Sequence, residues 1–592
     1  MIALPLFALA LLTPWGAQLK PDAIPLPEYP RPQLQRDAWI NLNGQWDYAV
    51  RPVSEITPPT AYEGKILVPF AIESKLSGVQ RRVGPGERLW YRRTFVAPDL
   101  AGRQRLLLHF GAVDWQADIF LDGQPLRRHE GGYDPFTLDL TSVLRAGSSE
   151  HELVVAVWDP TDTGAQPRGK QVRDPHGIWY TSVTGIWQTV WLETLPAVNV
   201  RQLSFVPDLD AGRVTVQLTV QGAAVPPATA TILITAAGKV VAESTVAAAE
   251  TPAVVLPLPA PRAWSPDDPF LYDVQVTLRS GDTTDTVRSY FGLRKVEVRR
   301  AADGFDRIFL NNQPLFLVGP LDQGWWPDGL YTAPSDAALR WDVETTRQMG
   351  FNVARKHVKV EPARWYYHCD RLGLMVWQDL PSAFRTGAAA HNVRSGESLD
   401  GIFSPAEDAQ FRRELGAMIE NLRGFACIVA WVPFNEGWGQ HHTNDILAWV
   451  KRLDPSRLVD GPSGWSDLGF GDLLDIHAYP GPAMFPAQGG RASVLGEFGG
   501  LGLPVPGHLW QEDKNWGYRN MKSAAELAER YTALIAQLPP LIEKGLTAAI
   551  YTQTTDVEIE VNGLITYDRA VVKIPVEKLA ALHNPLTHPK KK

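Results

Sequence analysis

Ile428-Val-Ala-Trp-Val-Pro-Phe-Asn-Glu436-Gly-Trp438 is an apolar run without alternating polar residues, and it ends on a carboxylate. Ser493-Val-Leu-Gly-Glu497-Phe-Gly-Gly500 repeats this pattern. Such runs are typical of parallel strands covered by helices on both faces. Either glutamate alone could be a surface carboxylate at a strand end. A carboxylate there costs stability unless it is solvated or paired, so the two together indicate chemistry.

Working outward from these runs, helical patterns and short apolar segments alternate from residue 295 to 585. We expect helices within 335–350 and 407–422, and eight strands at 314–318, 352–357, 374–379, 428–435, 457–461, 474–477, 493–497 and 548–553. This repeat predicts a (β/α)₈ barrel. Glu436 then closes the fourth strand and Glu497 the seventh, at the end of the barrel where such enzymes place their active sites.

The chain before the barrel reads as two all-β domains. Residues 21–196 hold short alternating or β-branched segments separated by turn signals such as Leu121-Asp-Gly-Gln-Pro125, which predicts a sandwich. Residues 197–294 are rich in Ala, Val and Thr, and suit a small immunoglobulin-like sandwich. The apolar stretch Ile2 to Leu12 suggests a secretory signal peptide over 1–17, cleaved after Ala17, and hence a periplasmic or secreted protein.

Composition excludes several classes of protein. At 592 residues the chain needs more than one core, and a net charge of −8 with no basic run before Lys590 argues against a nucleic-acid partner. No later apolar run is long enough to span a membrane. The 21 Trp residues modestly favour carbohydrate binding, since an indole can stack on a sugar. Cys369 and Cys427 read as buried hydrophobes, with a structural pair as the alternative.

Four motifs stand out in the first 200 residues: Trp39-Ile-Asn-Leu-Asn-Gly-Gln-Trp46, Leu89-Trp-Tyr-Arg-Arg93, His109-Phe-Gly-Ala-Val-Asp-Trp115 and Thr184-Gly-Ile-Trp-Gln-Thr-Val-Trp191. Each is weak alone, and the ordered series is strong. They occur in the order found in glycoside hydrolase family 2, the β-galactosidase, β-glucuronidase and β-mannosidase family. The chain resembles this family over nearly its whole length, which implies an N-terminal jelly-roll sugar-binding sandwich, an immunoglobulin-like sandwich and a TIM barrel.

The resemblance implies a retaining β-glycosidase with Glu436 as acid/base and Glu497 as nucleophile. Retention needs two carboxyl groups about 5 to 5.5 Å apart, so that one can attack the anomeric carbon while the other protonates the leaving oxygen. Asn435 matches the family's Asn that hydrogen-bonds the sugar 2-hydroxyl. Arg355 matches the family's strand-two Arg, but Val358 stands where the family usually has a His, and His357 comes one position earlier.

Further substrate-binding candidates lie at other strand ends. His477 and Tyr479 follow the sixth strand and could contact a sugar hydroxyl or orient Glu497; packing is the alternative for His477. Asp379 could contact a hydroxyl, or serve as a helix cap or salt-bridge partner. Trp438 suits stacking on a sugar or loop packing, and Gln553 a specificity contact. No metal site or cofactor is expected, because adjacent His441 and His442 chelate poorly without other ligands.

The competing hypotheses concern which sugar the protein recognises and whether it is a hydrolase, another enzyme or a binding protein. We expect an exo-acting, β-galactosidase-like hydrolase of oligo- or polysaccharides, with β-glucuronidase as the nearest alternative. The Asn-x-Lys signature of glucuronidases is not evident, although Lys356 and Arg519 could bind a sugar carboxylate. A non-catalytic carbohydrate-binding protein is the alternative of another class, and an inverting hydrolase or transglycosylase a third. Carbohydrate is the expected partner, and homo-oligomerisation stays open.

Overall fold

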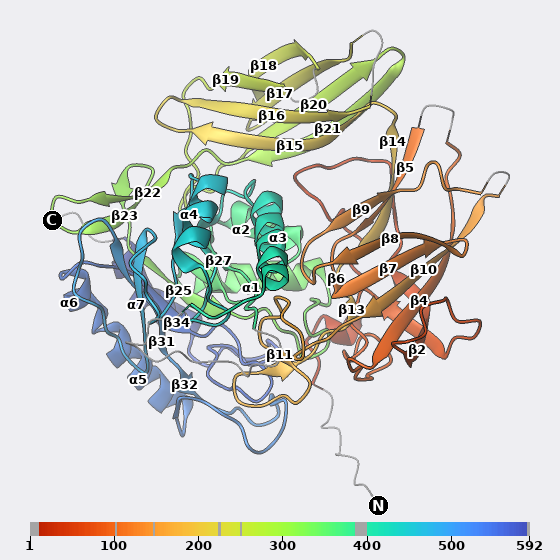
Figure 1. The fold of residues 1–592 in the computed structure, drawn as a ribbon. Coiled ribbons are helices and arrows are strands. Elements are labelled where there is room, and N and C mark those ends of the chain that lie inside the picture. Colours follow the sequence, from red (N-terminus) through yellow and green to blue (C-terminus); the bar gives the residue numbers. More distant parts are fainter. Residues whose placement is uncertain are drawn as a thin grey trace, which may run out of the picture.

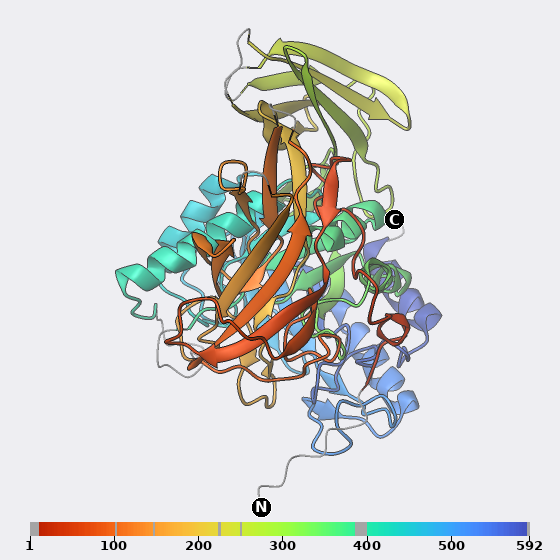
Figure 2. The same cartoon turned by 90° about the vertical axis from the view of Figure 1, so that its right-hand side faces the viewer.

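The computed structural model describes residues 11–100, 104–145, 148–222, 227–248, 252–384 and 400–588. Two β-sandwiches precede a barrel, so the predicted fold class is confirmed. In Figure 1 the second sandwich lies above the barrel and the N-terminal sandwich lies beside it; Figure 2 shows the same arrangement from the right. Within the described residues, no helix is both long and apolar enough to cross a bilayer.

The N-terminal sandwich packs a four-stranded sheet against a six-stranded one. The first has the order β1 (Trp39–Asn41), β14 (Val190–Pro196), β5 (Gln104–Phe110), β9 (Phe136–Asp139). The second has the order β3 (Gly64–Val68), β2 (Gly44–Pro52), β4 (Glu87–Val96), β10 (Glu150–Trp158), β7 (Gln116–Leu121), β8 (Gln124–Glu130). Burial alternates along β7, and the inward residues form one apolar core between the sheets. Short pairs β6 (Val113–Asp114) with β13 (Gly185–Ile186) and β11 (Gln171–Val172) with β12 (Tyr180–Thr181) complete this domain.

The second sandwich is smaller. Its sheets are β15 (Asn199–Asp208), β16 (Arg213–Gln221), β19 (Ala253–Pro257), and β18 (Lys239–Ala247), β17 (Thr229–Ala236), β20 (Tyr272–Ser280), β21 (Thr283–Phe291). Burial alternates with period two along β20, as expected when one face of a sheet meets water. A small antiparallel sheet of β22 (Val296–Arg300), β23 (Asp306–Leu310) and β24 (Gln313–Pro314) then leads into the barrel.

Eight parallel strands form the barrel in the order β29 (Leu458–Val459), β28 (Ile428–Val432), β27 (Met375–Asp379), β26 (Val353–Lys356), β25 (Leu317–Asp322), β34 (Leu546–Thr552), β31 (Ala492–Gly499), β30 (Leu473–Ala478). A parallel bridge between Asp460 and Leu473 joins the two ends of this order. The first strand was predicted at 314–318 and lies at 317–322, because Gln313 and Pro314 pair with β23 instead.

The helices around the barrel are α1 (Asp336–Gln348), α2 (Ala363–Leu372), α3 (Pro405–Leu422), α4 (Thr443–Leu453), α5 (Ala524–Ile535), α6 (Leu538–Ile542) and α7 (Val576–Thr587), with the strand pair β32 (Leu501–Gly502) and β33 (Arg519–Asn520) before α5. Ser335 caps α1, and Ser404 with Glu407 forms a capping box on α3, which starts with a proline. The predicted full set of eight βα units is wrong in one respect: residues 460–472 and 479–491 form no helix. Both segments are broken by Gly and Pro, which disfavour helix.

The segment before the N-terminal sandwich packs on the barrel. Thr13 is buried and donates from its backbone N and its hydroxyl to Asp328 Oδ2, at 2.9 and 2.7 Å. Trp15 contacts Trp341 with ring centroids 5.5 Å apart, ahead of the short 3₁₀ helix η1 (Gly16–Gln18). Residues 1–10 of the predicted signal peptide lie outside the described residues, and its cleavage stays a prediction.

Candidate active site

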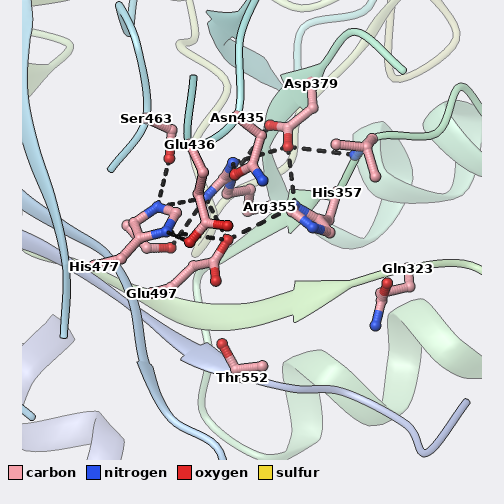
Figure 3. Close-up of polar contacts among 12 residues, drawn as sticks. Gln323, Arg355, His357, Asp379, Asn435, Glu436, Ser463, His477, Glu497 and Thr552 are labelled. Atoms are coloured by element: carbon pink, nitrogen blue, oxygen red, sulfur yellow. Dashed lines mark hydrogen bonds and ion pairs between the residues drawn. The ribbon is translucent and has the colours of Figure 1, made fainter. Parts of the chain in front are cut away.

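Glu436 and Glu497 face each other at the carboxyl end of the barrel (Figure 3). Glu436 lies four residues beyond β28, and Glu497 is near the end of β31. Both are nearly buried, with 9% and 5% of their surface exposed. One carboxylate oxygen of each lies within 4.8 Å of the other. The strand-end placement inferred from the sequence therefore brings the two carboxylates together.

Arg355, at the end of β26, holds the site together. Its guanidinium is fully buried and donates to Asp379 at 2.9 and 3.1 Å, to Asn435 Oδ1 at 2.8 Å and to Glu497 Oε1 at 3.2 Å. A planar fork of fixed donors is suited to contacting several acceptors at once. Arg355 thus links strands β26, β27 and β31 with the segment after β28.

Asp379 lies behind Arg355. Its side chain is fully buried, and besides Arg355 it contacts His357 Nδ1 at 3.1 Å and accepts from the backbone N of Val358 at 3.3 Å. All of these contacts come from the protein itself. The structure therefore places Asp379 where it orients Arg355 and His357, the salt-bridge alternative of the sequence analysis.

Glu497 is held in the ionised form. Burial alone would raise its pKa, but His477, the Arg355 guanidinium and the hydroxyl of Tyr479 outweigh burial and lower that pKa to about 2. Tyr479 donates to Glu497 Oε2 at 2.5 Å, lies 2.7 Å from Thr552 Oγ1, and stacks on Tyr518 at 3.8 Å between ring centroids. A carboxylate fixed at both oxygens and charged at neutral pH has the properties of a nucleophile.

Glu436 receives a different partner. His477 Nδ1 lies 2.8 Å from Glu436 Oε1, while His477 Nε2 lies 2.6 Å from Ser463 Oγ and 3.2 Å from Arg355 Nη1. Nδ1 donates to Glu436 in both charge states of the ring: the neutral ring accepts at Nε2 from Arg355, which can only donate, and the protonated ring can donate from Nε2 to Ser463 Oγ. Burial would lower the pKa of His477, but the Glu497 and Glu436 carboxylates raise it above its ordinary value.

Asn435 has a free donor at the site. Its Oδ1 accepts from Arg355, whereas its buried Nδ2 finds no hydrogen-bond partner in the described parts of the chain. A buried donor without a partner is costly, which points to a ligand oxygen as its acceptor. The contact of Asn435 with a sugar hydroxyl stays a prediction.

Trp438 and Gln553 are packed more tightly than the sequence indicated. Trp438 is 2% exposed and packs on Trp179 of the N-terminal sandwich, with ring centroids 5.0 Å apart. Gln553 accepts from Gln323 Nε2 and donates to Asn562 Oδ1, both at 2.7 Å. Trp179 is therefore the more accessible aromatic ring near Trp438.

The carboxylates and imidazole of Glu436, His477 and Glu497 are close enough to hold a metal ion. The Arg355 guanidinium contacts both Glu497 and His477, however, so a dication would lie beside a fixed positive charge. This donor set fits a proton-transfer site better than a metal site.

Sequence reasoning missed Ser463, Tyr518 and the loop residues of the N-terminal sandwich, which no strand-end pattern marks. Lys356, considered as a carboxylate ligand, is paired with Asp322 and Glu361, each at 2.9 Å. Arg519, the other candidate, is exposed on β33. Neither lies free at the site.

Sequence models of three domains match the chain: glycosyl hydrolase 2 galactose-binding domain-like at 68–185, glycosyl hydrolases family 2 at 198–294, and glycosyl hydrolases family 2, TIM barrel domain, at 306–475. The chain belongs to glycoside hydrolase family 2. The family 2 barrel match includes Glu436 and ends before Glu497.

Relatives of this family 2 chain carry two names. A β-galactosidase of Thermoanaerobacter pseudethanolicus is 26% identical over 386 residues, 63% of this chain and 48% of that protein. A putative β-glucuronidase of Formosa agariphila is 26% identical over 392 residues, 63% of this chain and 34% of that protein. The chain thus spans half or less of the length of these curated relatives.

Solved structures share the fold over nearly the full chain. The β-D-glucuronidase of Dictyoglomus thermophilum has a TM-score of 0.72 at 16% identity, covering 95% of this chain and 98% of that one. The Bifidobacterium dentium β-glucuronidase complexed with coumarin-3-O-glucuronide has a TM-score of 0.72 at 19% identity, covering 93% and 97%. At these identities the likeness concerns the fold alone.

Proposed function

We propose that the protein is a retaining exo-β-glycosidase that cleaves terminal O-glycosidic bonds of oligo- or polysaccharides by double displacement. The observation that carries the proposal is the approach of the Glu436 and Glu497 carboxylates to within 4.8 Å. In retaining enzymes the carboxyl groups are about 5 to 5.5 Å apart, whereas inverting enzymes need about 6.5 to 9.5 Å to admit a water. The short separation favours retention.

In the first step Glu497 attacks the anomeric carbon while Glu436 gives its proton to the departing oxygen, so that a glycosyl ester forms and the aglycone leaves as an alcohol. Arg355 and Tyr479 hold Glu497 in position for this attack. Asn435 Nδ2 can donate to the sugar 2-hydroxyl, a contact that strengthens as charge develops on the ring.

In the second step Glu436 takes a proton from water, and the resulting hydroxide displaces Glu497 from the anomeric carbon. The esterified Glu497 has lost its charge, which favours release of the proton from Glu436. His477 donates to Glu436 Oε1 and supports the carboxylate form, while Oε2 is left to exchange the proton. The product keeps its anomeric configuration.

The test is a hydrolysis screen against aryl β- and α-glycosides, including galactoside, glucuronide, mannoside, glucoside and arabinofuranoside, with Glu497→Ala as the blank. We expect turnover of a β-glycoside, and ¹H NMR should show the β-anomer of the product first. First appearance of the α-anomer would refute retention. Silence across the panel would favour the carbohydrate-binding alternative.

The role of Glu436 is tested by the leaving group. Replacing Glu436 by Ala should slow the hydrolysis of alkyl glycosides by about 10² to 10⁴-fold and spare aryl glycosides with acidic phenols, which need little protonation. The exposed Glu420 on α3 gives a matched control variant, Glu420→Ala. Equal losses on both substrate types would contradict acid catalysis by Glu436.

A further inference from the structure

The described residues contain four buried lysines, and one of them lacks an acidic partner. Lys356 pairs with Asp322 and Glu361, Lys359 with Glu361, and Lys573 with Asp556, all at 2.7 to 3.0 Å. Lys170 is only 6% exposed, yet its ammonium makes no hydrogen bond or ion pair with any described residue. The Nζ atom is not among the fully buried unpartnered atoms, so the ammonium keeps contact with solvent and can receive an anionic ligand.

Lys170 belongs to the N-terminal sandwich but lies at the mouth of the barrel. The backbone N atoms of Arg168 and Gly169 donate to Ser382 O, just beyond β27, at 3.0 and 3.1 Å. Gly169 has φ +63°, and a Cβ there would lie 2.5 Å from the carbonyl oxygen of Val358, just beyond β26. This close backbone approach needs glycine, and it fixes the neighbouring Lys170 beside the ends of β26 and β27.

The ammonium of Lys170 lies beside Tyr180 and acts on His357, a neighbour of the nucleophile. It lies 5.7 Å from the ring centroid of Tyr180, and together with burial its charge holds the pKa of His357 well below the ordinary value. His357 in turn lies 3.9 Å from Glu497 Oε1. The His357 ring thus links the surroundings of Lys170 to those of the nucleophile.

The acids nearest to the reaction centre are already occupied. Glu497 is held by Arg355 and Tyr479, and Asp379 by Arg355 and His357. Arg168, two residues before Lys170, likewise forms no ion pair among the described residues; its guanidinium lies over the Phe384 ring at 4.3 Å, with Nε buried and unpartnered. The loop therefore brings two cations to the mouth of the barrel; the Asp162 and Asp159 carboxylates act on Arg168, whereas Lys170 has no ion-pair partner among the described residues.

We propose that Lys170 determines specificity by binding an anionic group on the sugar, a uronide carboxylate or a sulfate ester. The inference rests on the proposed glycosidase function and narrows its substrate class. A carboxylate or sulfate oxygen accepts a charge-assisted hydrogen bond from the ammonium and compensates its charge. A neutral hydroxymethyl group can accept a hydrogen bond but leaves the charge uncompensated.

Kinetics on matched substrate pairs form the first test: 4-nitrophenyl β-glucuronide against β-glucoside, and β-galacturonide and 6-sulfo-β-galactoside against β-galactoside. We expect the wild-type enzyme to prefer the anionic member of at least one pair, and the three anions separate carboxylate from sulfate. Lys170→Met should lower kcat/KM for that substrate by about 100-fold, as for loss of one partner of a buried charge pair, and leave the neutral member nearly unchanged. Lys170→Arg should restore much of the preference.

The control is Lys239→Met, because Lys239 is exposed on β18 of the second sandwich. It should change neither member of any pair. A wild-type preference for the neutral sugars, or an equal loss on both members in Lys170→Met, would overturn the proposal. Circular dichroism and the unfolding midpoint of each variant identify a folding defect. If Lys170→Met is misfolded, the preference for anionic over neutral substrates is compared between the wild type and Lys170→Arg instead.

A binding measurement separates this inference from the proposed function. Calorimetry would use the Glu436→Gln variant, which keeps Glu497 paired with Arg355, and the methyl β-glycosides of the same sugars. Tighter binding of an anionic glycoside, lost in Glu436→Gln/Lys170→Met, would support the Lys170 site even if the wild-type enzyme hydrolysed nothing. Equal binding of anionic and neutral sugars would refute it even if hydrolysis were observed.

Discussion

The two β-sandwiches contact opposite ends of the same barrel. The N-terminal sandwich sends the loop between β10 and β14 to the carboxyl end, where Thr181 N donates to Glu558 at 2.9 Å and Tyr180 bonds Glu560. At the amino end, after the second sandwich, Arg294 donates to Ala426 O at 2.8 Å and to Ile428 O at 2.6 Å, at the start of β28. Two domains of one architecture thus have different roles, one at the site and one in support.

Glu497→Ala should give the largest effect at the carboxyl end. Removing the nucleophile should lower kcat by about 10⁴-fold or more, because no other group forms the glycosyl ester. The fold should survive, since Glu497 belongs to the site and not to an apolar core. Steady-state kinetics together with circular dichroism measure both, and turnover like that of the wild type would contradict the assignment.

Arg294→Met should show the reverse pattern at the amino end. The buried guanidinium also donates to Ser456 O at 3.1 Å, so its loss removes a donor from three backbone carbonyls, of which Ile428 O keeps Arg457 Nε at 3.2 Å. We expect a loss of about 3 kcal/mol in the free energy of unfolding and little change in kcat/KM at low temperature. Urea unfolding measures the first quantity. The exposed Arg279 supplies the control Arg279→Met, and a selective loss of kcat would show that this end also shapes the site.

The seam between the N-terminal sandwich and the barrel, which is the contact of Trp115 with Glu414, should make the free energy of unfolding depend on pH. Glu414 of α3 accepts from Trp115 Nε1 at 3.3 Å, and burial, with the nearby Asp134 carboxylate, raises the pKa of Glu414 from 4.5 to about 8. Between these values the folded state binds more protons than the unfolded state. The contribution of Glu414 is thus complete below pH 4.5 and lost as the pH rises through about 8.

Urea unfolding between pH 5 and 9 checks this expectation, approximately spanning the range set by the pKa of Glu414. Glu414→Gln should flatten the decline in the free energy of unfolding by at most about 1.4 kcal/mol per pH unit. Glu420→Gln on the same helix should leave the slope unchanged, since Glu420 is exposed. If the free energy of unfolding declined with pH as steeply in Glu414→Gln as in the wild type, protonation of Glu414 would not contribute to the stability of this contact.

Trp179→Ala should have the smallest effect of the four. The half-buried Trp179 ring lies 5.0 Å from Trp438 and 5.7 Å from Phe384, at the edge of the mouth. Loss of one aromatic contact surface should raise KM about threefold to tenfold with kcat little changed. Initial-rate measurements over a range of substrate concentration distinguish the two. A fall in kcat at constant KM would place this ring in the chemistry instead.

The barrel was predictable from the sequence because its signal is local. Apolar runs ending in Glu436 and Glu497 locate strand ends, and parallel strands place those ends together. The first strand was misplaced because Gln313 and Pro314, which belong to the preceding hairpin, carry no sign of antiparallel pairing with β23. The missing helices could have been anticipated from the Gly and Pro content of 460–472 and 479–491.

The rest of the site could not be predicted because it depends on contacts between distant segments. Lys170 lies 327 residues before Glu497, in a different domain, and the contacts of Arg168 and Gly169 with Ser382 and Val358 bring it to the mouth. Ser463 reaches His477 from an irregular loop after β29. The role of Asp379 stayed open because the sequence pattern of a strand-end carboxylate is the same whether it contacts a ligand or a neighbouring arginine.

The contact between Gly169 and Val358 has a consequence for how enzymes of this architecture diversify. The proposed charge preference is carried by a segment that is separate in sequence from the barrel, and its residues Arg168 and Gly169 pack on the barrel through backbone atoms. Recombination of N-terminal domains between relatives could therefore transfer a preference for acidic or neutral sugars without any mutation in the catalytic domain. An alanine at position 169 would block this transfer, because its Cβ would clash with the carbonyl oxygen of Val358 and the segment could not pack on the barrel of another relative.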